Sequence, residues 1–406
     1  MKNIYILIIA IFTINVSNAQ WTSQISGTSL YLISVYFTDA NTGYVVGLNG
    51  TILKTINGGN IWTAQNSGTT NSLVSVFFTD SITGYVSGAN GTILKTSNGG
   101  LNWISLTSGT TSNLRSVYFV DNNIGYIVGD MGLVLKTITG GSSWISSNVG
   151  ILTTLFSVYF FSPTSGISVG SVTISNTKKC YILKTLNGGT TWTTQYSDTS
   201  YSLNSIFFVD NNTAYVVGWD GKILKTLNGG NLWTKLNIGN ARALSSVYFT
   251  DVNIGYVAGS DTNNNGIILK TIDGGNTWTN QFTLSSYNLN SVFFINTNVG
   301  FAVGNIGTII KTKNGGEIGI SEFQGKMENT FIYPNPTSDK LYINLLSIND
   351  FQNTTVSIYD LQGQLLLNQI VNQGKTEINI SHLAKGVYIL KLNNLQTKYF
   401  SKFIKK

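Results

Sequence analysis

The chain has 406 residues, of which 42% are hydrophobic and 10% are charged, and its formal net charge is +7. This much apolar content with so little charge excludes a largely disordered chain. The single cysteine, Cys180, excludes an internal disulfide, so packing and hydrogen bonds have to stabilise the fold.

The first 19 residues have the pattern of a signal peptide. Lys2 precedes an apolar core at 4–12, and small residues lead to an expected cleavage site between Ala19 and Gln20. This apolar run is too short to span a bilayer and no other segment is long enough, so we expect no transmembrane segment. The pattern predicts export from the cytoplasm.

A repeat of about 41 residues extends from residue 20 to residue 316. In each copy a strand ends in Lys-Thr and leads to a Gly-Gly turn. The repeat lysines are Lys54, Lys95, Lys136, Lys184, Lys225, Lys270 and Lys311. Runs rich in β-branched and aromatic residues, separated by turn residues, predict four short strands per copy, as at 32–37, 43–47, 51–55 and 61–65.

The tryptophans predict that the repeats form a closed ring. After the seventh turn, Gly319 stands where the pattern requires Trp, whereas Trp21 has the correct spacing before Trp62. Trp21 therefore belongs to the last strand of a repeat whose other three strands lie near residue 300. We predict an all-β, seven-bladed β-propeller closed by an N-terminal strand. The structural tryptophans are Trp21, Trp62, Trp103, Trp144, Trp192, Trp233 and Trp278.

The run from Thr271 to Trp278 and its copies resemble the Asp-box, or BNR, repeat. The resemblance implies that Thr and Asp or Asn side chains brace a hairpin turn. A feature present in every blade cannot mark one site on a ring, so the box is interpreted as structural. The repeat lysines are expected on the same face as a recurring Asp turn, with exposed ion pairs such as Lys54 with Asp39.

Missing residue types argue against catalysis. Between residues 20 and 316 there is no His or Glu, and Arg115 and Arg242 are the only arginines. Ser-His-Asp, Cys-His and His-ligated metal chemistry are therefore excluded there. We expect no enzyme, no cofactor and no metal site. The alternative is a carbohydrate-active hydrolase, a sialidase-like propeller glycosidase using unrepeated aspartates. These are Asp130, Asp198, Asp220 and Asp261.

Departures from the repeat indicate a ligand-binding face opposite the lysines. The middle hairpin is lengthened at 171–180 and 260–265, and Trp219 with Asp220 forms the equivalent tip between them. Arg115 and Arg242 lie near the starts of inner strands. These four residues are the candidates for binding an unknown glycan or protein ligand; the alternative is that they are ordinary solvated loop residues.

Two other ligand classes are not expected. The segment 261–266 resembles the first half of an EF-hand loop, but Ile272 replaces the required Glu, so it is interpreted as a polar hairpin and not a calcium site. The basic residues of the repeats are not clustered in a stripe, which argues against nucleic acid. We expect a monomer.

Residues 20–316 resemble the seven-bladed photosystem II assembly and stability factor family, in segments such as 114–121 and 125–129. The resemblance implies a propeller that binds a protein partner and is not an enzyme. The binding face of that family is rich in arginine. Of the corresponding inner-strand positions here, only Arg115 is an arginine.

The repeat ends at a linker, residues 317–328, and a second domain is expected at 329–406. Tyr333-Pro334-Asn335-Pro336 is followed by alternating strands at 341–343, 356–361 and 386–392, a pattern that predicts a small Ig-like β-sandwich. The segment resembles the C-terminal sorting domain of type IX secretion cargo in Bacteroidota. The resemblance implies that the type IX secretion machinery is a partner and that the propeller is secreted or attached to the outer cell surface. The alternative is an ordinary Ig-like domain.

Overall fold

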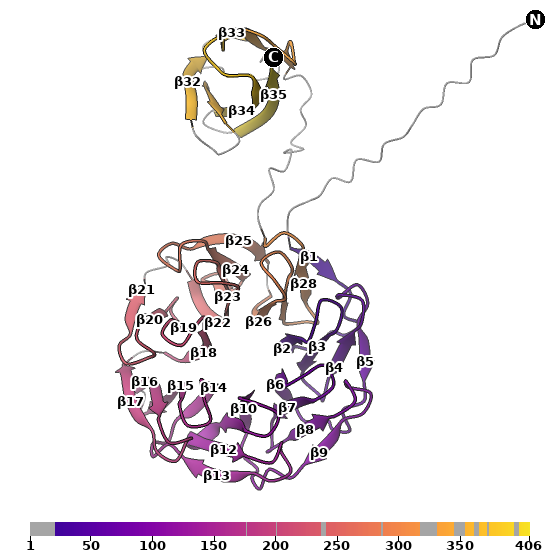
Figure 1. The fold of residues 1–406 in the computed structure, drawn as a ribbon, viewed down its shortest axis with the longest axis vertical. Helices are drawn as coiled ribbons and strands as arrows, with labels where there is room; N and C mark the ends of the chain where they lie inside the picture. The colour runs from indigo at the N-terminus through magenta and orange to yellow at the C-terminus, as the bar shows by residue number, and fades with distance from the viewer. Residues whose placement is uncertain are drawn as a thin grey trace, which may run out of the picture. The chain divides into compact units, whose positions relative to one another are not determined.

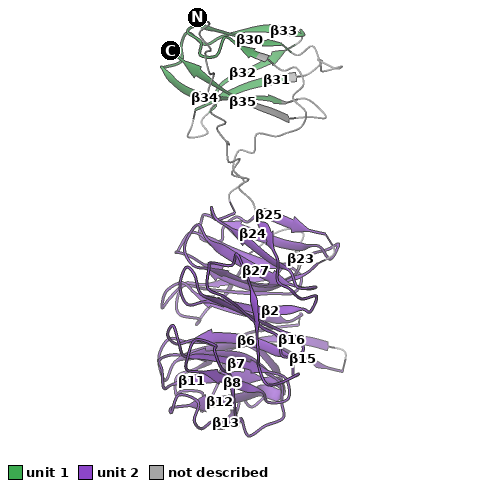
Figure 2. Ribbon diagram, turned by 90° about the vertical axis from the view of Figure 1, so that its right-hand side faces the viewer, with its two compact units in different colours: residues 1–18, 319–406 green, residues 19–318 purple. Residues whose placement is uncertain are grey.

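The structure is a computed structural model that describes residues 21–175, 177–199, 201–236, 241–285, 287–316, 331–344, 354–360, 365–371, 373–393 and 398–406. These residues belong to two compact units, one within residues 19–318 and one within 319–406 (Figure 2). The expected signal peptide, its cleavage residues Ala19 and Gln20, and the linker 317–328 lie outside the described residues.

The first unit consists of seven four-stranded antiparallel sheets, which we number as blades 1 to 7. Blade 1 contains β2 (Leu32–Phe37), β3 (Gly43–Gly47), β4 (Ile52–Thr55) and β5 (Thr63–Gln65). Blade 2 contains β6 (Leu73–Phe78), β7 (Gly84–Gly88), β8 (Ile93–Thr96) and β9 (Ile104–Leu106). Blade 3 contains β10 (Leu114–Phe119), β11 (Gly125–Gly129), the 3-10 turn η1 (Asp130–Gly132), β12 (Leu133–Thr137) and β13 (Ile145–Asn148).

The remaining blades follow the same order. Blade 4 contains β14 (Thr154–Phe160), β15 (Gly166–Ile174), β16 (Thr177–Thr185) and β17 (Thr193–Asp198). Blade 5 contains β18 (Leu203–Phe208), β19 (Ala214–Gly218), β20 (Ile223–Thr226) and β21 (Thr234–Leu236). Blade 6 contains β22 (Ala241–Phe249), β23 (Gly255–Asp261), β24 (Gly266–Thr271) and β25 (Thr279–Leu284). Blade 7 contains β26 (Leu289–Phe294), β27 (Gly300–Gly304), β28 (Ile309–Thr312) and β1 (Thr22–Gln24).

The ring is closed by the N-terminal strand, as the position of Trp21 predicts. β1 pairs antiparallel with β28, with Thr22 opposite Lys311 and Gln24 opposite Ile309. Figure 1 shows the seven sheets around one axis, with the first strand of each blade nearest the centre and the fourth at the rim. Closure gives every blade two neighbours and leaves no terminal blade exposed.

Aromatic rings fill the interfaces between blades. Between blades 1 and 2, Tyr44 stacks on Phe78 with a centroid separation of 4.1 Å, and the edge of Trp103 meets Phe78 at 6.1 Å. All three side chains are buried. Phe37, Phe301 and Trp62 make the same arrangement at the closing interface, so blades 7 and 1 pack like the others.

The Asp-box turn is braced as the resemblance implies. In blade 1, the amide of Gly59 donates to Thr55 Oγ1 (2.9 Å) and the amide of Ile61 donates to Asn57 Oδ1 (2.9 Å). Gly58 and Gly59 have φ values of 65° and 80°, a conformation that favours glycine. The Gly58 amide also donates to Asn41 O (2.9 Å), which places the box and the Asp turn at the same end of the blade.

The expected ion pair between Lys54 and Asp39 is wrong. The Lys54 ammonium donates to the carbonyl of Gly99 in the next blade (2.6 Å), and Asp39 accepts the amides of Asn41 (2.7 Å) and Thr42 (2.9 Å). The Tyr44 hydroxyl donates to the same Gly99 carbonyl (2.8 Å). We use the term interblade lysines for the repeat lysines that donate to a Gly carbonyl in the Asp-box of the next blade. They are Lys54, Lys95, Lys184, Lys225 and Lys311.

A second set of contacts joins the inner strands. One serine of each inner strand accepts the backbone N–H of a residue in the following blade. The pairs are Ser34 with Val76, Ser75 with Val117, Ser116 with Val158, Ser157 with Ile206, Ser205 with Val247, Ser246 with Val292, and Ser291 with Val35. The last pair joins blade 7 to blade 1, so the belt is continuous.

The second unit has two sheets around one core. One sheet has the order β29 (Phe331–Tyr333), β30 (Lys340–Asn344), β33 (Lys375–Asn379). The other has the order β32 (Leu365–Val371), β31 (Thr354–Tyr359), β34 (Gly386–Asn393), β35 (Lys398–Lys405). Leu341 and Ile378 from the first sheet and Val356, Leu390 and Phe403 from the second share one buried cluster, so the two sheets form a small β-sandwich.

Deleting residues 20–25 should lower the melting temperature far more than removing residues 317–406. The deletion removes Trp21 and β1, which leaves β28 as an open edge of blade 7, whereas the second unit has its own core. Thermal unfolding of both truncated chains measures the difference. Equal effects would contradict a closed ring.

Replacing Lys225 by Met should lower the free energy of unfolding by about 1–2 kcal/mol, because a charged donor to a buried carbonyl is lost. Lys225 donates to Gly274 O (2.6 Å), beside the hydroxyl of Tyr215 (2.7 Å). Burial and the charge of Asp210 raise the pKa of Tyr215 to about 12, so this second donor keeps its proton at neutral pH.

The matched control is Lys235→Met, which removes an exposed lysine of the same blade. Denaturant titration should find its effect within about 0.5 kcal/mol of zero. A Lys225→Met effect no larger than that of the control would refute a stabilising role for the interblade lysines.

Candidate functional site

The lengthened hairpins are extensions of blades 4 and 6 on the face opposite the boxes. β15 and β16 each have nine residues, and their pairing continues outward to Ile174 opposite Thr177. The corresponding strands of blade 1 have five and four residues. The β15–β16 hairpin projects from the propeller in Figure 2. The shorter tip of blade 5 therefore lies between two raised hairpins.

Trp219 at this tip is part of an aromatic pair. Its ring stacks on Tyr201 with a centroid separation of 5.8 Å and an interplanar angle of 18°. The ammonium of Lys178, from the raised hairpin of blade 4, lies 3.7 Å from the centroid of Tyr201. Trp219 is 37% exposed and Tyr201 is 40% exposed. The expected exposed Trp is thus present, supported by a second ring and a cation.

Backbone contacts fix the position of Trp219. Its amide donates to Ser202 O (2.9 Å), and the residue forms an isolated antiparallel bridge with Ala243 of blade 6. Trp219 is therefore attached to its own blade and to blade 6. A rigid aromatic surface of this kind loses little entropy when a ligand binds.

An ion pair with a buried lysine and a partly exposed aspartate holds the tip of blade 5. The Lys222 ammonium lies 2.5 Å from Asp198 Oδ2, and the Tyr196 hydroxyl donates to the same oxygen (2.6 Å). The thiol of Cys180 donates to Asp198 Oδ1 (3.4 Å). Burial and the hydrogen bond to Asp198 raise the pKa of Tyr196. These contacts tie the tip of blade 5 to the rim strand of blade 4.

Asp220 and Arg242 are closer to Trp219 than Arg115 is. Asp220 is exposed and has φ of 57°, the turn conformation that Asn49 and Asn90 have in blades 1 and 2. Arg242 precedes Ala243 in β22, and only its backbone belongs to the described part of the chain. Asp220 directly follows Trp219, and Arg242 directly precedes the residue that bridges to Trp219. Arg115 lies in blade 3.

Arg115 is engaged within its own blade. Its guanidinium makes two hydrogen bonds to Asp130, from Nε to Oδ1 (2.9 Å) and from Nη2 to Oδ2 (3.1 Å), and Asn113 also donates to Oδ2 (2.8 Å). Burial raises the pKa of Asp130, but the hydrogen bonds from Arg115 and Asn113 outweigh this effect and lower the pKa below its ordinary value. The bidentate pair braces the tip of blade 3.

Asp130→Asn should lower the free energy of unfolding at pH 7 by about 1–2 kcal/mol, since the charged acceptor of Arg115 is lost. Because folding lowers this pKa, the contribution is complete above the unfolded pKa of about 3.9 and is lost as the pH falls through the folded pKa. The difference between wild type and variant should therefore shrink below about pH 4.

Asp220→Asn is the control, because both residue types tolerate positive φ and Asp220 is exposed. Urea titrations between pH 7 and pH 2 measure both variants. A difference for Asp130→Asn that stays constant with pH would contradict the ion-pair explanation.

The segment 261–266 forms the turn of the raised hairpin in blade 6. Asp261 Oδ1 accepts the amides of Asn263 (2.8 Å) and Asn265 (2.9 Å), and Oδ2 accepts the Asn265 side chain (3.1 Å). The carboxylate is therefore occupied by its own turn. Within the described ranges, no group of three or more His, Cys, Asp or Glu side chains is arranged to hold a metal ion.

Sequence reasoning missed Tyr201, Lys178 and the Lys222–Asp198 pair. Tyr201 precedes an inner strand, and Lys178 lies on the extension of the middle hairpin, which most repeats lack. The insertion at 171–180 was the available signal for Lys178, but the sequence alone does not show which ring it meets.

Comparison with protein families identifies two segments. Residues 331–406 match the model for the secretion system C-terminal sorting domain, and residues 62–149 match the model for the photosynthesis system II assembly factor YCF48. The first match implies that the type IX secretion machinery takes part in export and that the protein is secreted or attached to the cell surface. No curated protein matches the chain.

Solved structures confirm the propeller fold. A YCF48 structure described as bound to D1 peptide is 20% identical, with a TM-score of 0.59, and the match covers 72% of this chain and 94% of that one. YCF48 from Cyanidioschyzon merolae is 20% identical, with a TM-score of 0.60 and coverage of 72% and 99%. The GH74 enzyme of Niastella koreensis is 16% identical, with a TM-score of 0.60 and coverage of 80% and 59%.

These results define the class of protein. The chain combines a seven-bladed, YCF48-like propeller with a C-terminal sorting domain for export. In the described residues, no helix has the length and apolar character needed to cross a membrane.

Proposed function

We propose that the exported propeller is a non-catalytic binding module and that its ligand binds at the tips of blades 4 to 6. The observation that carries this proposal is the stacked pair of Tyr201 and Trp219, partly exposed between two raised hairpins and adjacent to Lys178. An exposed indole ring stacks well on the apolar face of a sugar or on an aromatic side chain. The preferred ligand is a glycan at or beyond the cell surface.

The contacts of the unrepeated aspartates support a non-catalytic role. Asp130 is bonded to Arg115, Asp198 is bonded to Lys222 and Tyr196, and Asp261 is used in its turn. A glycosidase needs one carboxylic acid that donates a proton and a second carboxylate that attacks or activates water. Hydrogen bonds that stabilise the ionised form of Asp130 and Asp261 lower their pKa values, which is unfavourable for a general acid.

The second candidate is a propeller glycosidase. It is favoured by the similarity of fold to the GH74 enzyme and by Asp220, which is exposed beside Trp219. If the wild type hydrolyses a bound glycan and the Asp220→Asn variant does not, the result would support a glycosidase over a binding module.

Binding of the purified full chain to a glycan array should decrease at least tenfold in Trp219→Ala, because the stacking surface is removed. Trp219→Tyr should retain most of the binding, since it keeps an aromatic ring. Met131→Ala, at the exposed tip of blade 3, is the matched control and should bind normally. Trp62→Phe would not serve as a control, because Trp62 packs in a blade interface.

No binding to any glycan by wild type would argue against the glycan ligand. A protein ligand would then be the next candidate, because a propeller of the same fold has been described in complex with a peptide. Full glycan binding by Trp219→Ala would refute the proposed site.

A further inference from the structure

The described strands of the second unit have four sheet edges, and three of these carry some protection. Unpaired strand edges invite another strand to pair, so proteins shorten them, charge them, cover them or place proline there. β29 has three residues and is followed by Pro334 and Pro336. β33 carries Lys375 and Glu377, and Glu377 lies 2.7 Å from the ammonium of Lys340.

The C-terminal part of the third edge, β35, is covered by the segment around Asn335. The Asn335 side chain donates to Lys402 O (3.0 Å) and accepts the amide of Ile404 (3.0 Å). Thr337 then continues as a parallel neighbour, since its amide donates to Ile404 O (2.8 Å) and its carbonyl accepts the amide of Lys406 (2.8 Å). This part of the edge is therefore fully paired.

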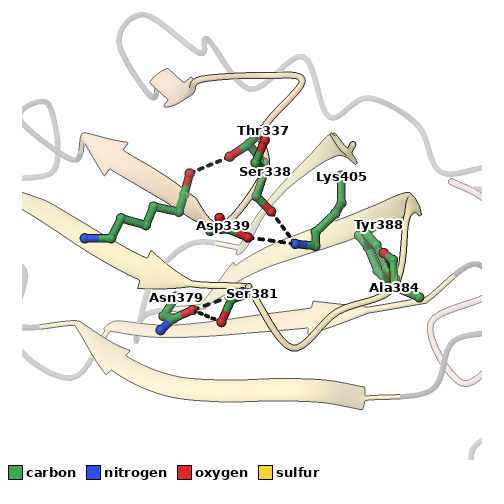
Figure 3. Close-up of polar contacts among 9 residues, drawn as sticks. Thr337, Ser338, Asp339, Asn379, Ser381, Ala384, Tyr388 and Lys405 are labelled. Atoms are coloured by element: carbon green, nitrogen blue, oxygen red, sulfur yellow. Dashed lines mark hydrogen bonds and ion pairs between the residues drawn. The ribbon is translucent and has the colours of Figure 1, made fainter.

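Lys405 holds the covering segment in place. Its buried ammonium donates to Ser338 O and lies 3.4 Å from Asp339 Oδ1 (Figure 3). The Thr337 hydroxyl closes the same turn by donating to Lys340 O (2.5 Å). Lys405 is therefore used inside the domain, whereas Lys402 and Lys406 are exposed.

β32 is the edge without such protection. It pairs only with β31 among the described strands, and its sequence, Leu-Leu-Leu-Asn-Gln-Ile-Val, has no charge, proline or glycine. A bulge near Leu366 disturbs its start, but residues 367–371 pair regularly with β31. Leu365 is 50% exposed and Ile370 is 62% exposed.

The two exposed residues lie on the same face of the sheet. Ile370 is opposite Thr355 and Leu365 is opposite Tyr359, whereas the buried Val356 and Ile358 point to the core between them. The open edge is thus flanked by apolar side chains on the outer face. A strand that pairs with β32 would gain backbone hydrogen bonds and would cover Leu365 and Ile370 at the same time.

We propose that β32 is the recognition edge of this domain and that its occupant is an extended segment of the export machinery, added as a fifth strand beside β32. The match of residues 331–406 to a sorting domain requires a surface that the machinery recognises. The uncharged, apolar edge fits a neutral segment with alternating apolar side chains. This inference concerns the second unit and is independent of the ligand of the propeller.

The test is export of the full chain in a bacterium with a type IX secretion system, measured as the amount of propeller at the cell surface and in the medium. Ile370→Lys should reduce this amount at least tenfold, because a lysine on the edge disfavours strand addition. Ile370→Thr, which keeps a β-branched neutral side chain, should be exported at close to the wild-type level. Ile404→Lys places the same charge on the covered β35 edge and should also be exported normally.

Each purified full-length variant should melt at the wild-type temperature, since the substituted side chains are partly exposed. Export of Ile370→Lys at the wild-type level would overturn the proposal, as would equal loss in Ile370→Lys and Ile404→Lys. A photoreactive phenylalanine at position 370 should cross-link to a component of the secretion system. A cross-linked dimer of the chain itself would instead assign the edge to self-association and overturn the proposed occupant.

Discussion

The fold depends on one contact between neighbouring blades, in which a lysine ammonium donates to the Gly carbonyl of the next Asp-box turn. The carbonyl lies at a blade interface and needs a donor, because a buried acceptor without a partner is costly. Tyr44 and Lys54 are cross-strand neighbours in β3 and β4, so their polar groups reach Gly99 together. Where Ile167 replaces the tyrosine, Lys184 still donates to Gly229 (2.9 Å) and also to Asn231 (2.7 Å).

This contact divides the propeller into two faces with different uses. The face of the boxes holds the Lys-Thr strand ends, the Gly-Gly turns and the Asp turns, all of which are bonded to one another within or between blades. The opposite face carries the hairpin tips, whose lengths differ between blades. Blades 4 to 6 vary most, and their tips hold Trp219, Tyr201 and Lys178.

The fold could be predicted from the sequence because it repeats, and the displaced Trp21 was sufficient to predict closure. The partners of the repeat lysines could not be predicted, because Lys54 and its acceptor Gly99 belong to different blades. The sequence instead indicated Asp39, the recurring opposite charge within the same repeat. The exposed Trp219 was predicted from its position outside the repeat. Its stacking on Tyr201 was not, because both residues lie at turns whose path is set by tertiary contacts.

The second unit differs from the propeller in how it treats its edges. The propeller removes edges by closing the ring, whereas β32 of the sandwich is an edge with one neighbour among the described strands. The tip residues were similarly hard to assign from sequence: Arg115 looked like a ligand-binding residue, but Asp130, fifteen positions later, accepts both of its hydrogen bonds. Residue types in the sequence indicated where polar side chains cluster. Only the structure showed which of them, such as Arg115, are already hydrogen-bonded to another residue of the chain.

The division into two faces is tested most directly by photo-crosslinking on the exported full chain at the surface of living cells. A photoreactive phenylalanine is placed at Ile174, on the raised hairpin of blade 4, or at Ile56, on the box face; both positions are exposed. We expect cross-linked products that depend on Trp219 from position 174 and none from position 56. Products from position 56 alone would contradict a binding face at the tips of blades 4 to 6.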